Sequence, residues 1–318
     1  MFTSEAGLIG VVDIGGTKIG VAAFCDPCNL VGRVEFPTAA FRDPIAAAEK
    51  IIGCLQNAAK QGGQPLRGVG VSCTGPVDPQ TGVIGDVDLL PGWNGFPLAS
   101  YLAEKLGVQV ALENDADAAT LAEAAWGAGK TSSRFIYVTV STGIGAGILL
   151  DGRLYRGVSG SHPEVGHQTI DSNGPLCYCG ATGCWESLAS GPAMAAWVRD
   201  NSPQGGTSLK DLSAAALCHL ARQGDPLALR AVQREAVFLG IGLANLITVF
   251  CPEIIALGGG VMQSADLLLD AAREVAQARC KLVPFQKTSI VTATLGTDAA
   301  LLGAARIWQS QFQATERT

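Results

Sequence analysis

The chain has 318 residues, of which 48% are hydrophobic and 16% charged, and this balance excludes a disordered protein. Its formal net charge is −6 and its pI is about 5.1, and no run of Lys or Arg is present, which argues against nucleic acid as a partner. The length predicts two domains or one large domain. The 40 glycines cluster in short runs after apolar segments, a pattern typical of tight turns that approach a ligand.

The first residues contain no basic segment followed by an apolar core, so we expect no signal peptide. The most apolar stretch, 238–250, has 13 residues, fewer than the roughly 20 that a membrane span needs, and it predicts a buried helix and no membrane partner. Without a signal peptide we expect a cytoplasmic location, and there ten cysteines indicate reduced thiols or metal ligands rather than disulfides. Cys25 and Cys28 form a C-x₂-C pair without a second ligand pair, and we assign them no function.

Residues 8–24 (LIGVVDIGGTKIGVAAF) predict two strands around a turn at Gly15-Gly16, because an apolar run ends at Asp13 and glycines let the chain reverse. Apolar residues at helical spacing follow, and later short apolar runs end in turn residues or acids. The elements expected after the first turn are a helix over 44–60, a strand over 67–75, a short helix over 97–106, a strand over 108–115 and a helix over 116–126.

Residues 135–155 repeat the plan of strand, Gly-rich turn and strand about 127 residues after its first occurrence. Two copies of one plan predict a duplicated α/β architecture with a ligand between the halves. The remaining elements expected are mainly helices over 208–249, a buried strand followed by glycines over 254–260, and a helix over 298–307.

Three Gly-rich turns, each after an apolar strand, predict a phosphate or nucleotide site. In the first, Asp13–Lys18 (DIGGTK), backbone N–H groups and Thr17 could face a phosphate, and Asp13 could hold hydrated Mg²⁺. The second is Ser141–Gly147 (STGIGAG), and the third, Gly258–Gly260, could pass under an adenine or ribose. The spacing is not that of a Walker A loop, and a simple strand–helix or hairpin turn is the alternative for each.

Glu113-Asn114-Asp115-Ala116 places acids at the carboxyl end of a predicted strand. Asp115 could accept the proton of a hydroxyl that attacks a γ-phosphoryl group, and Asn114 could bind an adjacent hydroxyl. The alternative is a helix N-cap, because Asn and Asp are favoured there and an Ala-rich helix follows. Both interpretations can hold for different residues of the segment.

One His and three Cys form the strongest signal, a closed tetrahedral zinc set made of His167, Cys177, Cys179 and Cys184. A closed set indicates a structural metal rather than a catalytic one. Two acids flank it, Glu164 and Glu186, and such carboxylates could bind vicinal sugar hydroxyls. The alternatives are buried free cysteines and solvated loop glutamates.

These motifs, together with PEVGH and CYCGATGCWE, resemble the ROK family (repressors, open reading frames and kinases) in order from about residue 8 to residue 304. The resemblance implies an α/β, two-domain, actin-like and hexokinase-like ATPase fold with a duplicated ribonuclease H-like motif and an interdomain cleft. We expect an N-terminal domain of residues 1–117 plus 299–318 and a C-terminal domain of residues 118–298. The family resemblance also implies a homodimer.

The resemblance implies roles residue by residue. Asp115 would be the general base, and zinc would be held by His167, Cys177, Cys179 and Cys184. The sugar would be held by Gly75, Asn114, Asp115, Glu164, His167 and Glu186. ATP with Mg²⁺ would be held by Asp13, Gly15, Gly16, Thr17, Lys18, Thr142 and Gly143, and its nucleoside by Gly258, Gly259 and Gly260.

The activity expected is ATP-dependent phosphorylation of a hexose, with glucose at the 6-hydroxyl first among the candidates. Fructose, mannose or an N-acetylhexosamine stay open, because His162-Pro163 ahead of Glu164 is similar to the fructokinase branch. A non-catalytic sugar-binding or regulatory protein is the alternative of another class. The family's repressors carry a winged helix-turn-helix ahead of the first phosphate loop, and here about seven residues precede the first strand, so we expect no such module.

Overall fold

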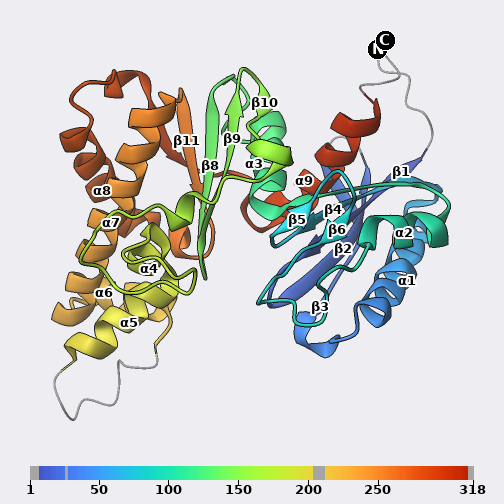
Figure 1. The fold of residues 1–318 in the computed structure, drawn as a ribbon, viewed down its shortest axis with the longest axis horizontal. Helices are drawn as coiled ribbons and strands as arrows, with labels where there is room; N and C mark the ends of the chain where they lie inside the picture. Colours follow the sequence, from blue (N-terminus) through green and yellow to red (C-terminus); the bar gives the residue numbers. More distant parts are fainter. Residues whose placement is uncertain (1–6, 26–27, 203–211, 314–318) are drawn as a thin grey trace. The chain divides into compact units, whose positions relative to one another are not determined.

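The computed structural model describes residues 7–25, 28–202 and 212–313, which form two compact units (Figure 1). Unit 1 comprises Met1–Lys130, Leu154–His162 and Thr297–Thr318. Unit 2 comprises Thr131–Arg153 and Pro163–Gly296. The chain therefore passes between the units four times, after residues 130, 153, 162 and 296.

The sheet of unit 1 has five strands in the order β3-β2-β1-β4-β7. Strands β1, β4 and β7 are parallel, whereas β2 is antiparallel to β1 and to β3. Because Asp13 pairs with Ser72 and Ser72 with Glu113, the penultimate residues of the three parallel strands lie in one row at their carboxyl ends. The strands are β1 (Leu8–Ile14), β2 (Lys18–Cys25), β3 (Asn29–Pro37), β4 (Leu66–Cys73) and β7 (Gln109–Asn114).

Helices cover both faces of this sheet (Figure 1). Helix α1 (Pro44–Gly62) begins at the Asp43 cap and buries its apolar stripe on one face, beside α2 (Leu98–Leu106). Helix α9 (Ala299–Trp308) lies on the other face, and α3 (Asp115–Trp126) packs on α9. A minor ribbon of β5 (Val77–Asp78) and β6 (Val83–Ile84) completes the unit.

The sheet of unit 2 repeats this arrangement, with the order β10-β9-β8-β11-β12. Strand β8 pairs antiparallel with β9 and parallel with β11, and β11 pairs parallel with β12. The duplicated α/β architecture expected from the sequence is therefore confirmed. The strands are β8 (Phe135–Val140), β9 (Ile144–Leu150), β10 (Arg153–Leu154), β11 (Ile254–Gly258) and β12 (Ser289–Thr292).

Helix α7 (Pro226–Phe250) is the central core helix of unit 2. Within the described ranges it is the one helix that could cross a membrane by length and composition, yet 56% of its most apolar stretch is buried inside the unit. The buried helix expected over 238–250 is its second half, and Leu239, Leu243 and Ile247 are fully buried there. The other helices are α4 (Trp185–Ala189), α5 (Gly191–Asn201), α6 (Ala214–Arg222) and α8 (Ala265–Arg279).

The expected elements are present. The elements that were not predicted are β3, β5, β6, β12, α4, α5 and α8. The beginning of the pattern expected over 208–249 falls outside the described residues, as do the two residues between Cys25 and Cys28. The expected boundary between residues 117 and 118 lies inside α3. Unit 1 keeps this helix whole and extends to Lys130, because α3 packs against α9. Independent folding of the two units stays a prediction.

Gly70 lies where α9 approaches the sheet, and a Cβ atom there would overlap the carbonyl oxygen of Ala304. We expect Gly70→Ala to lower the free energy of unfolding by about 1–3 kcal/mol, because backbone atoms must move apart. Chemical denaturation followed by tryptophan fluorescence measures the change.

The matched control is Gly53→Ala in α1, where a Cβ atom would meet nothing within 4 Å. There the free energy of unfolding should rise by about 0.5–1 kcal/mol, since alanine restricts the unfolded chain. Equal effects of the two substitutions would contradict the close packing of α9.

Candidate functional site

Two carboxylates lie at the carboxyl edge of the unit 1 sheet. Asp13 is the penultimate residue of β1 and accepts a hydrogen bond of 3.0 Å from the Ser72 hydroxyl, while Asp115 is the first residue of α3. Burial raises the pKa of Asp13 to about 6 in spite of that hydrogen bond. Burial, followed by the Asp13 carboxylate, raises the pKa of Asp115 to about 7. Perturbed acids at strand ends are typical of functional sites.

Asn114 caps α3. Its side-chain oxygen accepts from the backbone N–H groups of Ala116 (2.9 Å) and Asp117 (3.3 Å), so the N-cap interpretation is confirmed for this residue. Its amide nitrogen faces Gly75, where a Cβ atom would lie 2.9 Å away. The structure thus brings together three residues expected in the sugar site, Gly75, Asn114 and Asp115.

The first Gly-rich turn is a hairpin between β1 and β2. The Gly15 N–H donates to the Lys18 carbonyl (3.0 Å), and the Thr38 hydroxyl donates to the Gly15 carbonyl (2.7 Å). Thr17 is exposed, as is Lys18, whose amino group pairs with Glu35 at 3.0 Å. The hairpin interpretation is confirmed, and the phosphate role of this turn stays a prediction.

The other two Gly-rich turns lie together in unit 2, at the carboxyl ends of β8 and β11. Gly259 has φ +90°, and a Cβ atom there would overlap the carbonyl oxygen of Val140. A side chain at Gly143 would overlap a carboxylate oxygen of Glu186, the same oxygen that accepts from the Ile144 N–H at 2.8 Å. Glu186 is therefore fixed against the second turn, which also contains the exposed Thr142.

The four predicted metal ligands converge in unit 2. Each ligand residue contributes one atom, and these four atoms all lie within 4.8 Å of one another. The residues are His167, Cys177, Cys179 and Cys184. The Cys177 sulfur is 3.6 Å from His167 Nδ1, and the Cys179 and Cys184 sulfurs are 3.6 Å apart. A tetrahedral zinc ion with ordinary bond lengths separates such atoms by about 3.6–3.8 Å. The donor set therefore fits zinc.

The remaining predicted glutamates lie near the metal ligands. Burial is the largest cause that raises the pKa of Tyr178 to about 12, and the nearby carboxylates of Glu186 and Glu164 are the next causes. The Tyr178 hydroxyl lies 3.1 Å from Nε2 of His167. Sequence reasoning did not identify Tyr178, and its place between two cysteines was the one available signal.

A charged cluster lies around the segment Asn114-Asp115 in unit 1. Arg156 donates to the carboxylates of Glu113 (2.5 Å) and Asp117, and His162 Nδ1 lies 2.6 Å from Asp117. The sequence analysis assigned no role to Arg156 or Asp117. No local pattern marks them, because the partners lie 43 and 39 positions apart in the chain.

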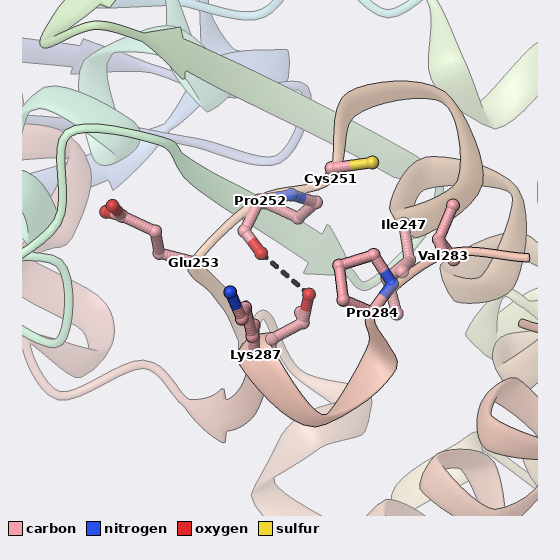
Figure 2. A pocket seen from close by; sticks show the side chains of 8 residues that line it. Ile247, Cys251, Pro252, Glu253, Val283, Pro284 and Lys287 are labelled. Atoms are coloured by element: carbon pink, nitrogen blue, oxygen red, sulfur yellow. Dashed lines mark hydrogen bonds between the residues drawn. The ribbon is translucent and has the colours of Figure 1, made fainter.

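An apolar pocket of about 140 Å³ lies elsewhere in unit 2 (Figure 2). Cys251, Pro252 and Glu253, which precede β11, line it on one side, and Lys287 and Thr288, which precede β12, on the other. It therefore lies at the amino ends of these strands, whereas Gly258–Gly260 lie at the carboxyl end of β11. The pocket and the Gly-rich turn at Gly258–Gly260 therefore lie at opposite ends of the unit 2 sheet.

The sequence pattern of the ROK family matches residues 9–311. The chain is 32% identical over 314 residues to a glucokinase of Thermotoga maritima, an alignment that covers 94% of this chain and 96% of that protein. It is 35% identical over 247 residues to a xylose repressor of Bacillus subtilis, which covers 78% of this chain and 62% of the repressor.

Among solved structures, the chain is similar to a ROK family glucokinase from Streptomyces griseus in complex with glucose and AMPPNP. The TM-score is 0.78 at 32% identity, over 94% of this chain and 98% of that one. This likeness confirms the expected hexokinase-like and actin-like ATPase fold class.

The geometry of the four ligand atoms predicts one zinc ion per chain. Elemental analysis by mass spectrometry after a chelator wash should find it, and Cys184→Ser should reduce it to well below half, because a tetrahedral site loses one thiolate. Cys184→Ser should also lower the thermal midpoint of unfolding.

The control is Cys251→Ser, an exposed cysteine outside the ligand set, which should retain full zinc. Unsubstituted protein with well under one zinc per chain would defeat the assignment.

Proposed function

The chain belongs to the ROK family and is an ATP-dependent sugar kinase, and we propose that it phosphorylates glucose at the 6-hydroxyl group. The observation that carries the proposal is Asp115, a partly buried carboxylate with a pKa raised to about 7 beside a second carboxylate. The glucokinase relatives support glucose as the acceptor.

Asp115 is the general base of the proposed reaction. A carboxylate with a pKa of about 7 is half ionised at neutral pH and accepts a proton more readily than an ordinary aspartate. It removes the proton of the 6-hydroxyl as the oxygen attacks the γ-phosphoryl group in line with the leaving oxygen. The hydrogen bond of 2.7 Å from the Ala116 N–H to Asp115 Oδ1 orients the carboxylate.

The sugar contacts are proposed for each unit separately. In unit 1, the Asn114 amide nitrogen, which lies beside Gly75, donates to a sugar hydroxyl. In unit 2, Glu164, His167 and Glu186 accept from or donate to further hydroxyls. The hydrogen bond from the Ile144 backbone N–H to the Glu186 carboxylate holds that side chain in place before sugar binds.

Asp13 is the group that would hold Mg²⁺ with the ATP phosphates. The fit rests on chemistry: burial destabilises the ionised form of Asp13, so a cation stabilises it. The bound cation would supply neutralisation of phosphate charge. The turn Gly15-Gly16-Thr17-Lys18 would contact phosphates from unit 1. Thr142 and Gly143 would do so from unit 2, and Gly258, Gly259 and Gly260 would lie against the nucleoside.

His167, Cys177, Cys179 and Cys184 would hold zinc with all four positions filled, so its role is structural. Bound zinc would fix the segment that carries His167 relative to Glu186, which follows Cys184 by two residues. A thiolate set of this kind needs reduced cysteines, which supports a cytoplasmic location. A homodimer belongs to the proposal on the family resemblance.

A second candidate function is a non-catalytic sugar-binding regulator. The observation that favours it is the 35% identity to a xylose repressor, which matches the chain over 247 residues. A regulator of this kind would bind sugar without consuming ATP, so one experiment separates the two functions.

A coupled ADP-release assay with Mg-ATP and a panel of sugars tests the proposal. Glucose, fructose, mannose, N-acetylglucosamine and N-acetylmannosamine are compared at equal concentration. We expect the highest kcat/KM with glucose, and mass spectrometry should find glucose 6-phosphate. Faster turnover of another sugar would replace glucose, and binding of a sugar without ADP release would support the regulator.

Asp115→Asn should reduce kcat by about 10²–10⁴-fold, because Asn cannot accept the hydroxyl proton. Sugar binding, measured by calorimetry, should persist, since the amide keeps the size of the side chain. The control is Asp200→Asn, an exposed residue of α5, which should leave kcat unchanged. Near-normal turnover of Asp115→Asn would defeat the role.

The pH profile gives a second readout of the same base. The raised pKa of Asp115 means that its carboxylate becomes protonated as pH falls through about 7, and a protonated acid cannot act as base. The kcat/KM for the sugar should therefore be constant above this pH and fall about tenfold per unit below it. A flat profile down to pH 5 would contradict the assignment.

A further inference from the structure

Arg156 bridges the junction at which β7 ends and α3 begins. Its guanidinium donates through one nitrogen to Glu113, the penultimate residue of β7, and through another to Asp117 in the first turn of α3. Asn114 and Asp115 lie between these two acids in the chain. One planar cation therefore spans the segment that carries the proposed base.

Glu113 and Asp117 are each also hydrogen-bonded to Asn114. The second carboxylate oxygen of Glu113 accepts from the Asn114 backbone N–H at 2.8 Å, and the Asp117 N–H donates to the Asn114 side chain at 3.3 Å. Movement of either acid would therefore move the Asn114 peptide or its cap. A continuous series of hydrogen bonds runs from Arg156 to the residue that precedes Asp115.

The cluster is buried, which makes its pairing obligatory. The Asp117 side chain is fully buried, Glu113 is 10% exposed and Arg156 is 21% exposed. Burial raises the pKa of Glu113, and Arg156 is the largest of the causes that oppose this rise. His162 Nδ1 reaches the same Asp117 oxygen at 2.6 Å and so shares this carboxylate with Arg156. Without Arg156, the buried carboxylates on both sides of Asp115 would lose the guanidinium, and Asp117 would keep the His162 imidazole as its side-chain partner.

We propose that Arg156 is a positioning residue for the phosphoryl-transfer reaction: through Glu113 and Asp117 it fixes Asn114 and Asp115 at the strand–helix junction. The inference rests on the proposed function of Asp115. Arg156 belongs to the short segment Leu154–His162, which enters unit 1 from β10 and leaves it at Pro163. That segment supplies both Arg156 and His162 to the cluster.

The test compares Arg156→Lys and Arg156→Met with the unsubstituted protein. Lys keeps the charge but lacks the planar fork, so it should restore part of the loss. We expect kcat to fall about 10²-fold in Arg156→Met, because a small misplacement of the base is costly, while the KM for ATP stays within about twofold. The control is Arg134→Met, which breaks the exposed pair with Asp151 in unit 2 and should leave kcat unchanged.

A double-mutant cycle separates positioning from a general loss of structure. If Arg156 acts through Asp115, then adding Arg156→Met to Asp115→Asn should lower the residual kcat by less than about threefold. An equal loss in both backgrounds would mean that the fold alone is damaged, and would overturn the proposal.

A second variant addresses folding directly. Glu113→Gln with Asp117→Asn removes the buried negative charges, so adding Arg156→Met should then restore the thermal midpoint without restoring kcat. Recovery of kcat in this triple variant would overturn the positioning role. If the unsubstituted protein turns over sugar and Arg156→Met has the same kcat, this inference alone is defeated. If the unsubstituted protein turns over no sugar, the proposed function and this inference are defeated together.

Discussion

Parallel hydrogen bonding among β1, β4 and β7 forces polar residues at the ends of these strands into one row, and the chemistry of unit 1 depends on that register. Asp13, Ser72 and Glu113 occupy equivalent positions in the three strands, and Asp115 follows at the start of α3. Bringing several acids to a partly buried edge is unfavourable unless each has a donor or a cation. The Ser72 hydroxyl donates to Asp13, and Arg156 donates to Glu113. Within the described part of the chain, Asp115 accepts from the Ala116 backbone N–H, and its pKa of about 7 exceeds the value of about 6 for Asp13.

Unit 2 repeats the sheet but uses different chemistry at its carboxyl edge. Its Gly-rich turns lie close together because glycines allow main chain and carboxylate to approach, as Gly143 does beneath Glu186. The loop with the three cysteines is held by two short backbone bridges, Thr169 to Cys184 and Leu176 to Thr182. A bound metal would thus complete a loop whose main chain is already paired, rather than organise an unstructured one.

Local signals explain what the sequence predicted. The turn at Gly15-Gly16, the Asn114 cap and the Cys/His set are each specified by residues near one another in the chain, so spacing alone identified them. The cluster around Arg156 was not predictable in this way, because it joins residues about 40 positions apart that meet only when the chain re-enters unit 1. The expected domain boundary differed from the contact-based one for the same reason, since the contact between α3 and α9 joins segments far apart in sequence.

The interleaved path of the chain also bears on the order in which the protein is completed during synthesis. Unit 2 has all of its residues once Gly296 has emerged from the ribosome. Unit 1 still lacks α9 at that moment, although its first strand was made almost 300 residues earlier. The face of its sheet that α9 covers includes Val11 of β1 and its neighbour Gly70 of β4, and it therefore stays without its helix until residues 299–308 have been made. For that interval the chain holds all residues of unit 2 together with an uncovered sheet face in unit 1, an apolar surface to which a chaperone can bind.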